Sequence, residues 1–326
     1  MPIIVVLSII GAAVPMALFL VLVWWLDRYE REPVRMVGRC FLWGAVPAAL
    51  GVLLLEMGAA ALGRFFLPAA TVAVISTALL SPIMEEAAKA WPLLWFRNHS
   101  DFNNGTDGIV YGTAIGFGFA VTENLCYHVD AFATGGLEKW LWSVVLRALY
   151  SGTFHALTTG LVGYFVGRGK FNRRQPAWVF PLGLSLAILA HIGWNTVLLS
   201  GEVLRSQHYF HLLAICYPLA FGALLALMQL SLAEESAVIR QELTEEMHLG
   251  VLLPDSVRIL PYYWRRRKKG WISPKYKQEY LELSASLAFK KRELGFCSAQ
   301  RRTSLLDEIE SVRKRLRSMT EAELQS

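Results

Sequence analysis

The chain has 326 residues, of which 54% are hydrophobic and 18% are charged, and it carries a net charge of +6 with a mean hydropathy of +0.38. An apolar share this high exceeds what the core of a soluble protein of this length needs, so an ordinary soluble domain is excluded. The 4 cysteines are dispersed without a Cys-x-x-Cys pair, which excludes a disulfide framework and a zinc knuckle.

Seven stretches are apolar and long enough to cross a bilayer, because a spanning helix needs about 20 predominantly apolar residues. They predict an all-α fold, a polytopic membrane bundle of about seven transmembrane helices. The fourth and fifth stretches carry more glycines and polar residues than the others. The stretches lie near Ile3–Leu26, Val37–Leu62, Ala69–Phe96, Gly108–Val129, Leu141–Val166, Trp178–Leu199 and Tyr209–Leu232.

The loops between these stretches predict the orientation, because cytoplasmic loops are rich in Lys and Arg. The first stretch has no basic segment before it and carries its charges after it, unlike a secretory signal. The loop after Leu62 and the loop after Leu199 are nearly free of basic residues. Basic residues gather in the first and fifth loops: Arg28, Arg31, Arg35 and Arg39, and then Arg168, Lys170, Arg173 and Arg174. We expect a multi-pass protein of the cell membrane with its N-terminus outside and its C-terminus in the cytoplasm.

The character of the chain changes after Leu232, where charged residues of both signs replace the apolar runs. We therefore predict two domains, a transmembrane domain over 1–232 and a charged cytoplasmic tail over 233–326. Helical spacing predicts a hairpin of two helices, over 275–294 and 298–319. The basic run Arg265–Lys269 has aromatic flanks, which favour lipid headgroups over nucleic acid. We expect the tail to be an interaction or regulatory module for a cytoplasmic partner.

Two adjacent carboxylates, Glu85 and Glu86, lie inside the third apolar stretch. An ionised side chain in a spanning helix costs several kcal/mol unless it is paired or faces a polar cavity, so it indicates a functional site. Lys89 lies four residues after Glu85 and shares its helix face. An ion pair between these two would be a structural explanation, but it leaves Glu86 unpaired. This asymmetry favours Glu86 as a general base and Glu85 as the carboxylate that is held and oriented.

The next three stretches each carry an ionisable residue and a polar neighbour. Taken singly, each has a structural explanation: Glu123 could pair with Lys89 or Arg147, and each histidine could make a hydrogen bond between helices. Glycines at 108, 112, 116 and 118 leave a thin helix face that permits close packing. Together, the residues predict one polar cavity enclosed by four spans. The pairs are Glu123 with Asn124, His155 with Thr158 and Thr159, and His191 with Asn195.

Such a cavity has two chemical uses. One is hydrolysis, with a Glu as general base for water and His or Asn stabilising the oxyanion. The other is ion or proton transport, with the same groups acting as a relay. Counting along the spans places Glu85 and His155 nearer the cytoplasmic face than Glu123 and His191. If all four belong to one site, the carboxyl of Glu85 or Glu86 lies within ~10 Å of both imidazoles, which leaves room for one water.

In their order along the chain, these motifs resemble those of the PrsW intramembrane proteases, whose motif layout is similar to that of the CAAX prenyl endopeptidases. The first loop, Asp27–Pro33, also fits the Asp-x-x-Glu-x-Glu-Pro pattern of the family. The resemblance covers roughly residues 20–200 and implies a signalling protease that cleaves a membrane protein at a specific site. In the protease that names the family, the target is a membrane-bound anti-sigma factor. The matching motifs are Glu85-Glu86-x-x-Lys89, Asp107-Gly108-Ile109-Val110-Tyr111-Gly112, Gly118-Phe119-x-x-x-Glu123-Asn124-x-x-Tyr127, His155-Ala156 and His191-x-x-x-Asn195.

The sequence thus predicts a membrane-embedded peptidase acting on a membrane protein or peptide substrate in the lipid bilayer, with a coupled transporter as the alternative. Glu85 or Glu86 would activate water with help from His155 or His191, and Asn195 or a protonated histidine would stabilise the oxyanion. The catalytic candidates are Glu85, Glu86, Glu123, His155 and His191, supported by Lys89, Asn124 and Asn195.

A divalent metal such as zinc is the open question in this site. Carboxylates and neutral imidazoles are ordinary zinc ligands, so the candidate ligands are Glu86, Glu123, His155 and His191. The sequence lacks the His-Glu-x-x-His motif, and nothing in it requires a metal. At this stage a metal-free reaction is favoured.

Overall fold

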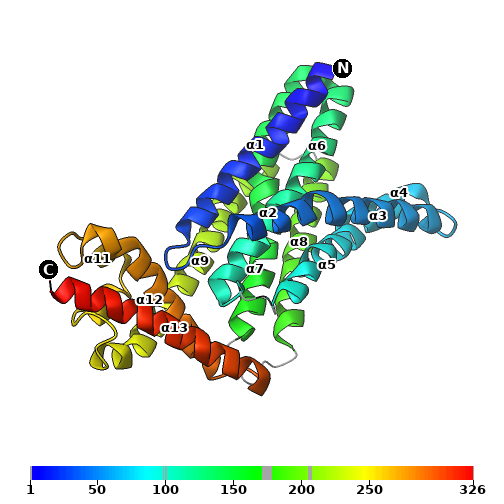
Figure 1. The fold of residues 1–326 in the computed structure, drawn as a ribbon. Coiled ribbons are helices and arrows are strands. Elements are labelled where there is room, and N and C mark those ends of the chain that lie inside the picture. Colours follow the sequence, from blue (N-terminus) through cyan, green and yellow to red (C-terminus); the bar gives the residue numbers. More distant parts are fainter. Residues whose placement is uncertain (1, 98, 100, 171–177, 205–207, 326) are drawn as a thin grey trace. The chain divides into compact units, whose positions relative to one another are not determined.

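The computed structural model describes residues 2–97, 99, 101–170, 178–204 and 208–325. In this part of the chain the regular structure is helical and contains no strand, which confirms the all-α prediction. The chain divides into two compact units (Figure 1). The first comprises Met1–Leu26, Glu32–Gly169 and Pro176–Met228, and the second comprises Asp27–Arg31, Lys170–Gln175 and Gln229–Ser326.

The first unit is built from long apolar helices, three of which contain a π-helical turn. These turns are Gly44–Ala48 between α2 and α3, Ser76–Leu80 between α4 and α5, and Arg147–Ser151 between α6 and α7. A π turn holds an extra residue and often lies at a functional site. The helices are α1 Pro2–Leu26, α2 Val34–Trp43, α3 Ala49–Gly63, α4 Ala69–Ile75, α5 Ser81–Phe96, α6 Gly105–Leu146, α7 Gly152–Lys170 and α8 Val179–Leu204, followed by α9 His208–His248, which enters the second unit.

Within the described residues, 6 helical stretches are long and apolar enough to cross a membrane, and one of them, Gly105–Gly169, has 65 residues. This stretch folds back on itself, because the backbone is not helical at Gly135 and Gly136. His128 Nδ1 lies 2.9 Å from Ser143 Oγ, whereas fifteen residues of continuous helix would separate them by about 22 Å. The two arms correspond to the predicted spans Gly108–Val129 and Leu141–Val166.

The first arm of α6 is the centre of this unit, and every residue from Gly105 to Ala120 is buried. The predicted glycine face allows this burial. A Cβ added at Gly112 would lie 2.3 Å from the Thr159 carbonyl oxygen on α7, and one at Gly118 would lie 2.0 Å from that of Phe41 on α2. Backbones therefore approach each other as they do in small-xxx-small packing of membrane helices. By contrast, large apolar side chains on α1 and α3 point outward, as a lipid-facing surface requires.

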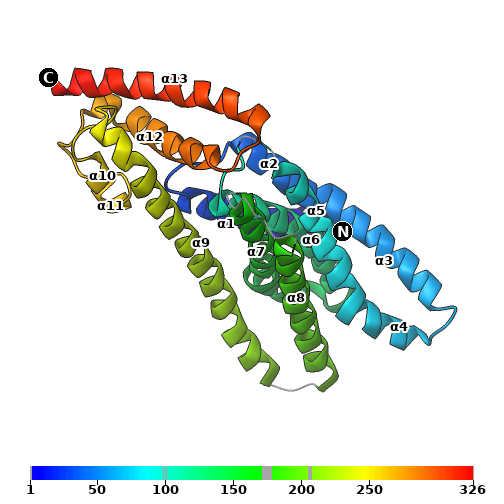
Figure 2. The same ribbon diagram turned by 90° about the horizontal axis from the view of Figure 1, so that it is seen from below.

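The second unit contains the predicted helical hairpin, formed by α12 Pro274–Leu294 and α13 Ala299–Leu324, which lie side by side (Figures 1 and 2). Two short helices, α10 Ser256–Ile259 and α11 Tyr263–Arg266, precede the hairpin. Glu246 at the end of α9 is buried and accepts hydrogen bonds from Lys291 on α12 at 2.6 Å and from Arg313 on α13 at 2.6 Å. This carboxylate fastens both tail helices to α9.

The first loop, Asp27–Arg31, belongs to the same unit as the tail. The predicted division at residue 232 placed this loop in the transmembrane domain instead. The Tyr29 hydroxyl donates to the Pro261 carbonyl at 2.5 Å, and the guanidinium of Arg266 lies 4.3 Å from the centre of the Tyr29 ring. Burial raises the pKa of Tyr29 above its usual value. The tail is thus in direct contact with the loop that follows α1.

Candidate active site

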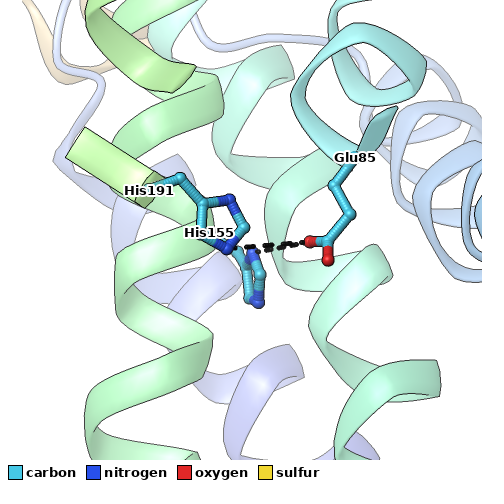
Figure 3. A group of neighbouring side chains, drawn as sticks. All are labelled: Glu85, His155 and His191. Carbon is cyan, nitrogen blue, oxygen red and sulfur yellow. Dashed lines mark ion pairs between the residues drawn. The ribbon is translucent and has the colours of Figure 1, made fainter. Parts of the chain in front are cut away.

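The predicted site residues come together from four helices of the first unit. Glu85, Glu86 and Lys89 lie on α5, Glu123 on the first arm of α6, His155 on α7 and His191 on α8. Glu85 Oε2 is 4.0 Å from His155 Nδ1 and 3.9 Å from His191 Nε2, and its carboxylate faces both rings (Figure 3). The predicted spacing of ~10 Å or less is confirmed. The difference in depth that residue counting suggested does not separate the four groups.

The pairing on α5 is the reverse of the predicted one. Glu86 Oε1 accepts hydrogen bonds from Lys89 Nζ at 2.6 Å and from Thr158 Oγ1 at 3.1 Å, and it lies 2.8 Å from His191 Nδ1. The prediction that Lys89 would pair with Glu85 and leave Glu86 free was wrong, because residues three apart share a helix face as well as residues four apart. Glu86 is therefore held in place through Oε1, whereas its Oε2 has no hydrogen-bond partner. Glu85 Oε2 is also buried without a hydrogen-bond partner.

His155 is held from both sides. Its Nε2 lies 2.6 Å from Glu123 Oε2, and its Nδ1 lies 3.0 Å from Lys89 Nζ. Glu123 is in turn paired with Arg147 Nη2 at 2.9 Å. The sequence named Arg147 only as a structural partner for Glu123, and this pair exists. Arg147 also donates from Nε to Asn124 Oδ1 at 2.8 Å and from Nη2 to Ser151 Oγ at 3.0 Å, so one guanidinium organises the outer side of the site.

The two imidazoles have the same arrangement of partners. In each ring one nitrogen contacts a carboxylate, Nε2 on Glu123 in His155 and Nδ1 on Glu86 in His191. The carboxylate places the N–H on that nitrogen. The other nitrogen of each ring is then an acceptor that faces Glu85 (Figure 3). The site therefore presents a carboxylate oxygen and two imidazole lone pairs to a common centre.

This donor set fits a divalent metal. The ligand atoms of Glu85, His155 and His191 lie within 4.8 Å of one another, and all three residues are buried. One carboxylate with two imidazoles is a common set in catalytic zinc sites, and the ligating histidines usually donate their other N–H to a carboxylate. The predicted ligands Glu86 and Glu123 hold these outer nitrogens instead. Coordination by His155 Nδ1 requires Lys89 Nζ to release its contact with that atom, while the ion pair of Lys89 with Glu86 can persist.

The two predicted supporting amides lie at the edge of the site. Asn195 Nδ2 donates to the Thr77 carbonyl at 2.9 Å, within the π turn that precedes α5, rather than to the ring of His191. Asn124 accepts from Arg147. Thr158, which contacts Glu86, was recognisable only as a polar residue one turn beyond His155.

Close packing at Gly116 sets the position of His155. A Cβ added at Gly116 would lie 2.4 Å from the His155 carbonyl oxygen, so α7 would have to move away from α6. We expect Gly116→Ala to reduce the activity of this site about tenfold, because a misplacement of about 1 Å can cost up to about 10²-fold in rate. Gly51→Ala on α3 is the control, since a Cβ there meets nothing within 4 Å. Equal activity of both variants would contradict this role of Gly116.

Comparison with known proteins gives a consistent result for the region that contains the site. A family model described as PrsW family intramembrane metalloprotease matches residues 32–224. Protease PrsW of Geobacillus kaustophilus is 31% identical over 198 residues, which cover 60% of this chain and 81% of the relative. Protease PrsW of Halalkalibacterium halodurans is 30% identical over 205 residues, covering 62% and 86%. Protease PrsW of Bacillus subtilis is 31% identical over 179 residues, covering 53% and 73%.

No solved structure matches this chain. The sequence relatives are all named as proteases, and this supports the predicted membrane peptidase over the transporter alternative. The matched region ends before the charged tail.

Proposed function

Because the chain belongs to the PrsW family of intramembrane metalloproteases, we propose that the cluster of Glu85, His155 and His191 hydrolyses peptide bonds of membrane-anchored proteins. The observation that carries the proposal is the convergence of one carboxylate oxygen and two imidazole nitrogens at a buried centre between apolar helices. Glu85 Oε2 is buried without a hydrogen-bond donor and faces both imidazoles, which supports a role for this oxygen as a ligand.

In this proposal Glu85, His155 and His191 hold a divalent ion such as zinc. When bound, the ion would polarise the scissile carbonyl and make the attacking water more acidic. Glu123 and Glu86 keep both imidazoles in the tautomer that directs a lone pair to the centre. We thus propose a metal-dependent reaction in place of the metal-free reaction that the sequence favoured.

The proton transfers are assigned to α5. Glu86 is fixed through Oε1, and its free Oε2 takes a proton from the attacking water as the water oxygen bonds to the peptide carbon. Lys89 then donates a hydrogen bond to the oxyanion that forms on the carbonyl oxygen. When the C–N bond breaks, Glu86 gives its proton to the leaving amine. The two products are a carboxylic acid and an amine, and the acid then gives its proton to the amine, so that they leave as a carboxylate and an ammonium.

We propose proteins with a single membrane span as substrates, including signalling regulators of the anti-sigma-factor type. The proposed orientation has the N-terminus outside and the tail in the cytoplasm, where the tail would meet a regulatory partner. The test is cleavage of a panel of single-span proteins in proteoliposomes, with the new N-termini sequenced. Glu138→Gln on the second arm of α6 is a control, since it removes an exposed carboxylate outside the cluster. Absence of cleavage of the whole panel, together with ion flux, would favour transport.

Metal dependence has its own test. We expect a chelator such as 1,10-phenanthroline to abolish cleavage and added Zn²⁺ to restore it, because the centre would lose the ion that polarises the carbonyl. Elemental analysis of the purified chain should find the metal in the wild type and much less in His155→Gln and His191→Gln. Full activity in chelator with no bound metal would overturn the metal assignment while leaving peptide hydrolysis intact.

A further inference from the structure

The basic run of the tail is divided between an inward and an outward face. Arg266 is buried, with Nε donating to the Leu260 carbonyl and its guanidinium over the Tyr29 ring. Its neighbours in the run are exposed: Arg265, Arg267, Lys268 and Lys269. We call these four residues, together with Tyr262 and Trp264, the basic-aromatic segment. One arginine anchors the segment and four cations remain on the surface.

Within the described residues, none of these four cations forms an ion pair with a carboxylate. Between Asp255 and Glu279 the sequence contains no Asp or Glu. In the described part of the chain, the guanidinium of Arg265 donates to the Arg258 carbonyl and that of Arg267 to the Tyr263 hydroxyl, and neither is paired with a carboxylate. The contrast with the hairpin is clear, since Arg313 and Arg315 there pair with glutamates. The segment therefore presents a concentrated positive charge to its surroundings.

Large aromatic side chains accompany this charge on the surface. Trp264 is 72% exposed and Tyr262 is 42% exposed. Exposed Trp and Tyr beside basic residues are typical of the boundary between membrane and water, where an aromatic ring lies among headgroups.

Contacts with the first loop place the segment near a membrane boundary. The guanidinium of Arg28 lies 4.6 Å from the centre of the Tyr263 ring, and Tyr29 donates to Pro261. Arg28 follows Leu26, the end of the apolar helix α1, by two residues. Because a chain extends by at most about 3.6 Å per residue, Arg28 cannot lie far from the point where α1 leaves the bilayer.

We propose that the basic-aromatic segment is a docking surface for the headgroups of anionic phospholipids, with Trp264 inserted among them. This inference rests on the chain being a membrane protein and is independent of the proposed peptidase mechanism. The occupant is assigned by charge, since four cations without carboxylate partners fit an anionic leaflet, and by the contacts of its neighbours Pro261 and Tyr263 with the loop that follows α1 in the chain.

The test uses the full chain in nanodiscs of phosphatidylcholine alone or of an equimolar mixture with phosphatidylglycerol. A water-soluble amine-reactive ester labels lysines, and mass spectrometry gives the labelling rate at each position. We expect Lys268 and Lys269 to react about fivefold more slowly in the anionic discs. Lys314, exposed on α13, is an internal control and should react equally in both. High salt should remove the difference, because at ~1 M the Debye length falls to about 3 Å.

Two double variants provide the second measurement. Arg265→Gln with Arg267→Gln should abolish the protection of Lys268 and Lys269, whereas Arg302→Gln with Arg317→Gln, which removes the same charge from exposed sites on α13, should leave it unchanged. Equal rates in both lipids would overturn the proposal. Equal slowing of Lys314 in the anionic discs would also overturn it, because it would indicate only a general surface potential.

Discussion

We expect Glu85→Gln to abolish peptide cleavage without lowering the thermal stability of the metal-free protein. The buried Oε2 of Glu85 has no hydrogen-bond donor and faces two imidazole nitrogens at 3.9 and 4.0 Å. A neutral amide is easier to bury there than an unpaired carboxylate, so folding loses nothing. The site loses its only anionic ligand, and we expect the cleavage rate to fall by at least about 10²-fold.

Glu86→Gln should differ from Glu85→Gln in its effect on stability. Glu86 neutralises Lys89, whose ammonium is fully buried, and it also contacts His191 and Thr158. Removing one partner of a buried ion pair costs about 3–5 kcal/mol, because the other charge stays buried without compensation. We therefore expect Glu86→Gln to lose both cleavage and stability, and Glu86→Gln with Lys89→Met to recover part of the stability but no cleavage.

The two variants are compared by substrate cleavage, by metal content and by thermal unfolding in one detergent. Unfolding is measured on chelator-treated, metal-free proteins, because a bound ion stabilises the folded state by itself. The expected pattern is loss of cleavage in both, a lower unfolding temperature in Glu86→Gln only, and loss of bound zinc in Glu85→Gln. A lower unfolding temperature in Glu85→Gln, with the metal retained, would show that Glu85 is the structural carboxylate and that the assignment is reversed.

The sequence was sufficient for the parts of the fold that depend on long apolar runs. Helix α1 was expected over 3–26 and is found over 2–26, and the tail hairpin has its two helices where helical spacing placed them. Apolar patterns extend over whole segments, so a prediction based on them remains correct when a boundary is wrong by a few residues. The fold-back at Gly135–Gly136 was predicted as a loop between two spans for the same reason.

The pairing of side chains in the site depends on how the helices are rotated and crossed, which the sequence does not specify. Spacing on α5 allowed Lys89 to pair with Glu85 or Glu86, and the choice is made by His191 and Thr158, which come from other helices. Residue counting suggested different depths for these groups, whereas Glu85, His155 and His191 converge because they lie on helices whose crossing the sequence does not give. Only the set of polar residues could be inferred, and their pairing required the structure.

Arg147 lies outside the metal cluster and positions it through Glu123, so its replacement should lower cleavage. It lies in the π turn before α7 and contacts Glu123, Asn124 and Ser151 together, and its guanidinium is 3.7 Å from the centre of the Tyr127 ring. Without it, Glu123 loses its counter-charge and its fixed position against His155 Nε2. We expect Arg147→Gln to lower cleavage by about 10–100-fold, the usual cost of losing a partner that orients a metal-binding histidine.

A double-mutant cycle distinguishes this positioning role from a general structural one. If Arg147 acts through Glu123, then Arg147→Gln with Glu123→Gln should be no worse than Glu123→Gln alone, because residues in one hydrogen-bonded network are not additive. Arg147→Lys should restore only part of the activity, since an ammonium supplies the charge but not the planar fork that reaches Glu123, Asn124 and Ser151 at once. Additive losses, or full rescue by lysine, would mean that Arg147 contributes charge or packing alone and does not set the orientation of His155.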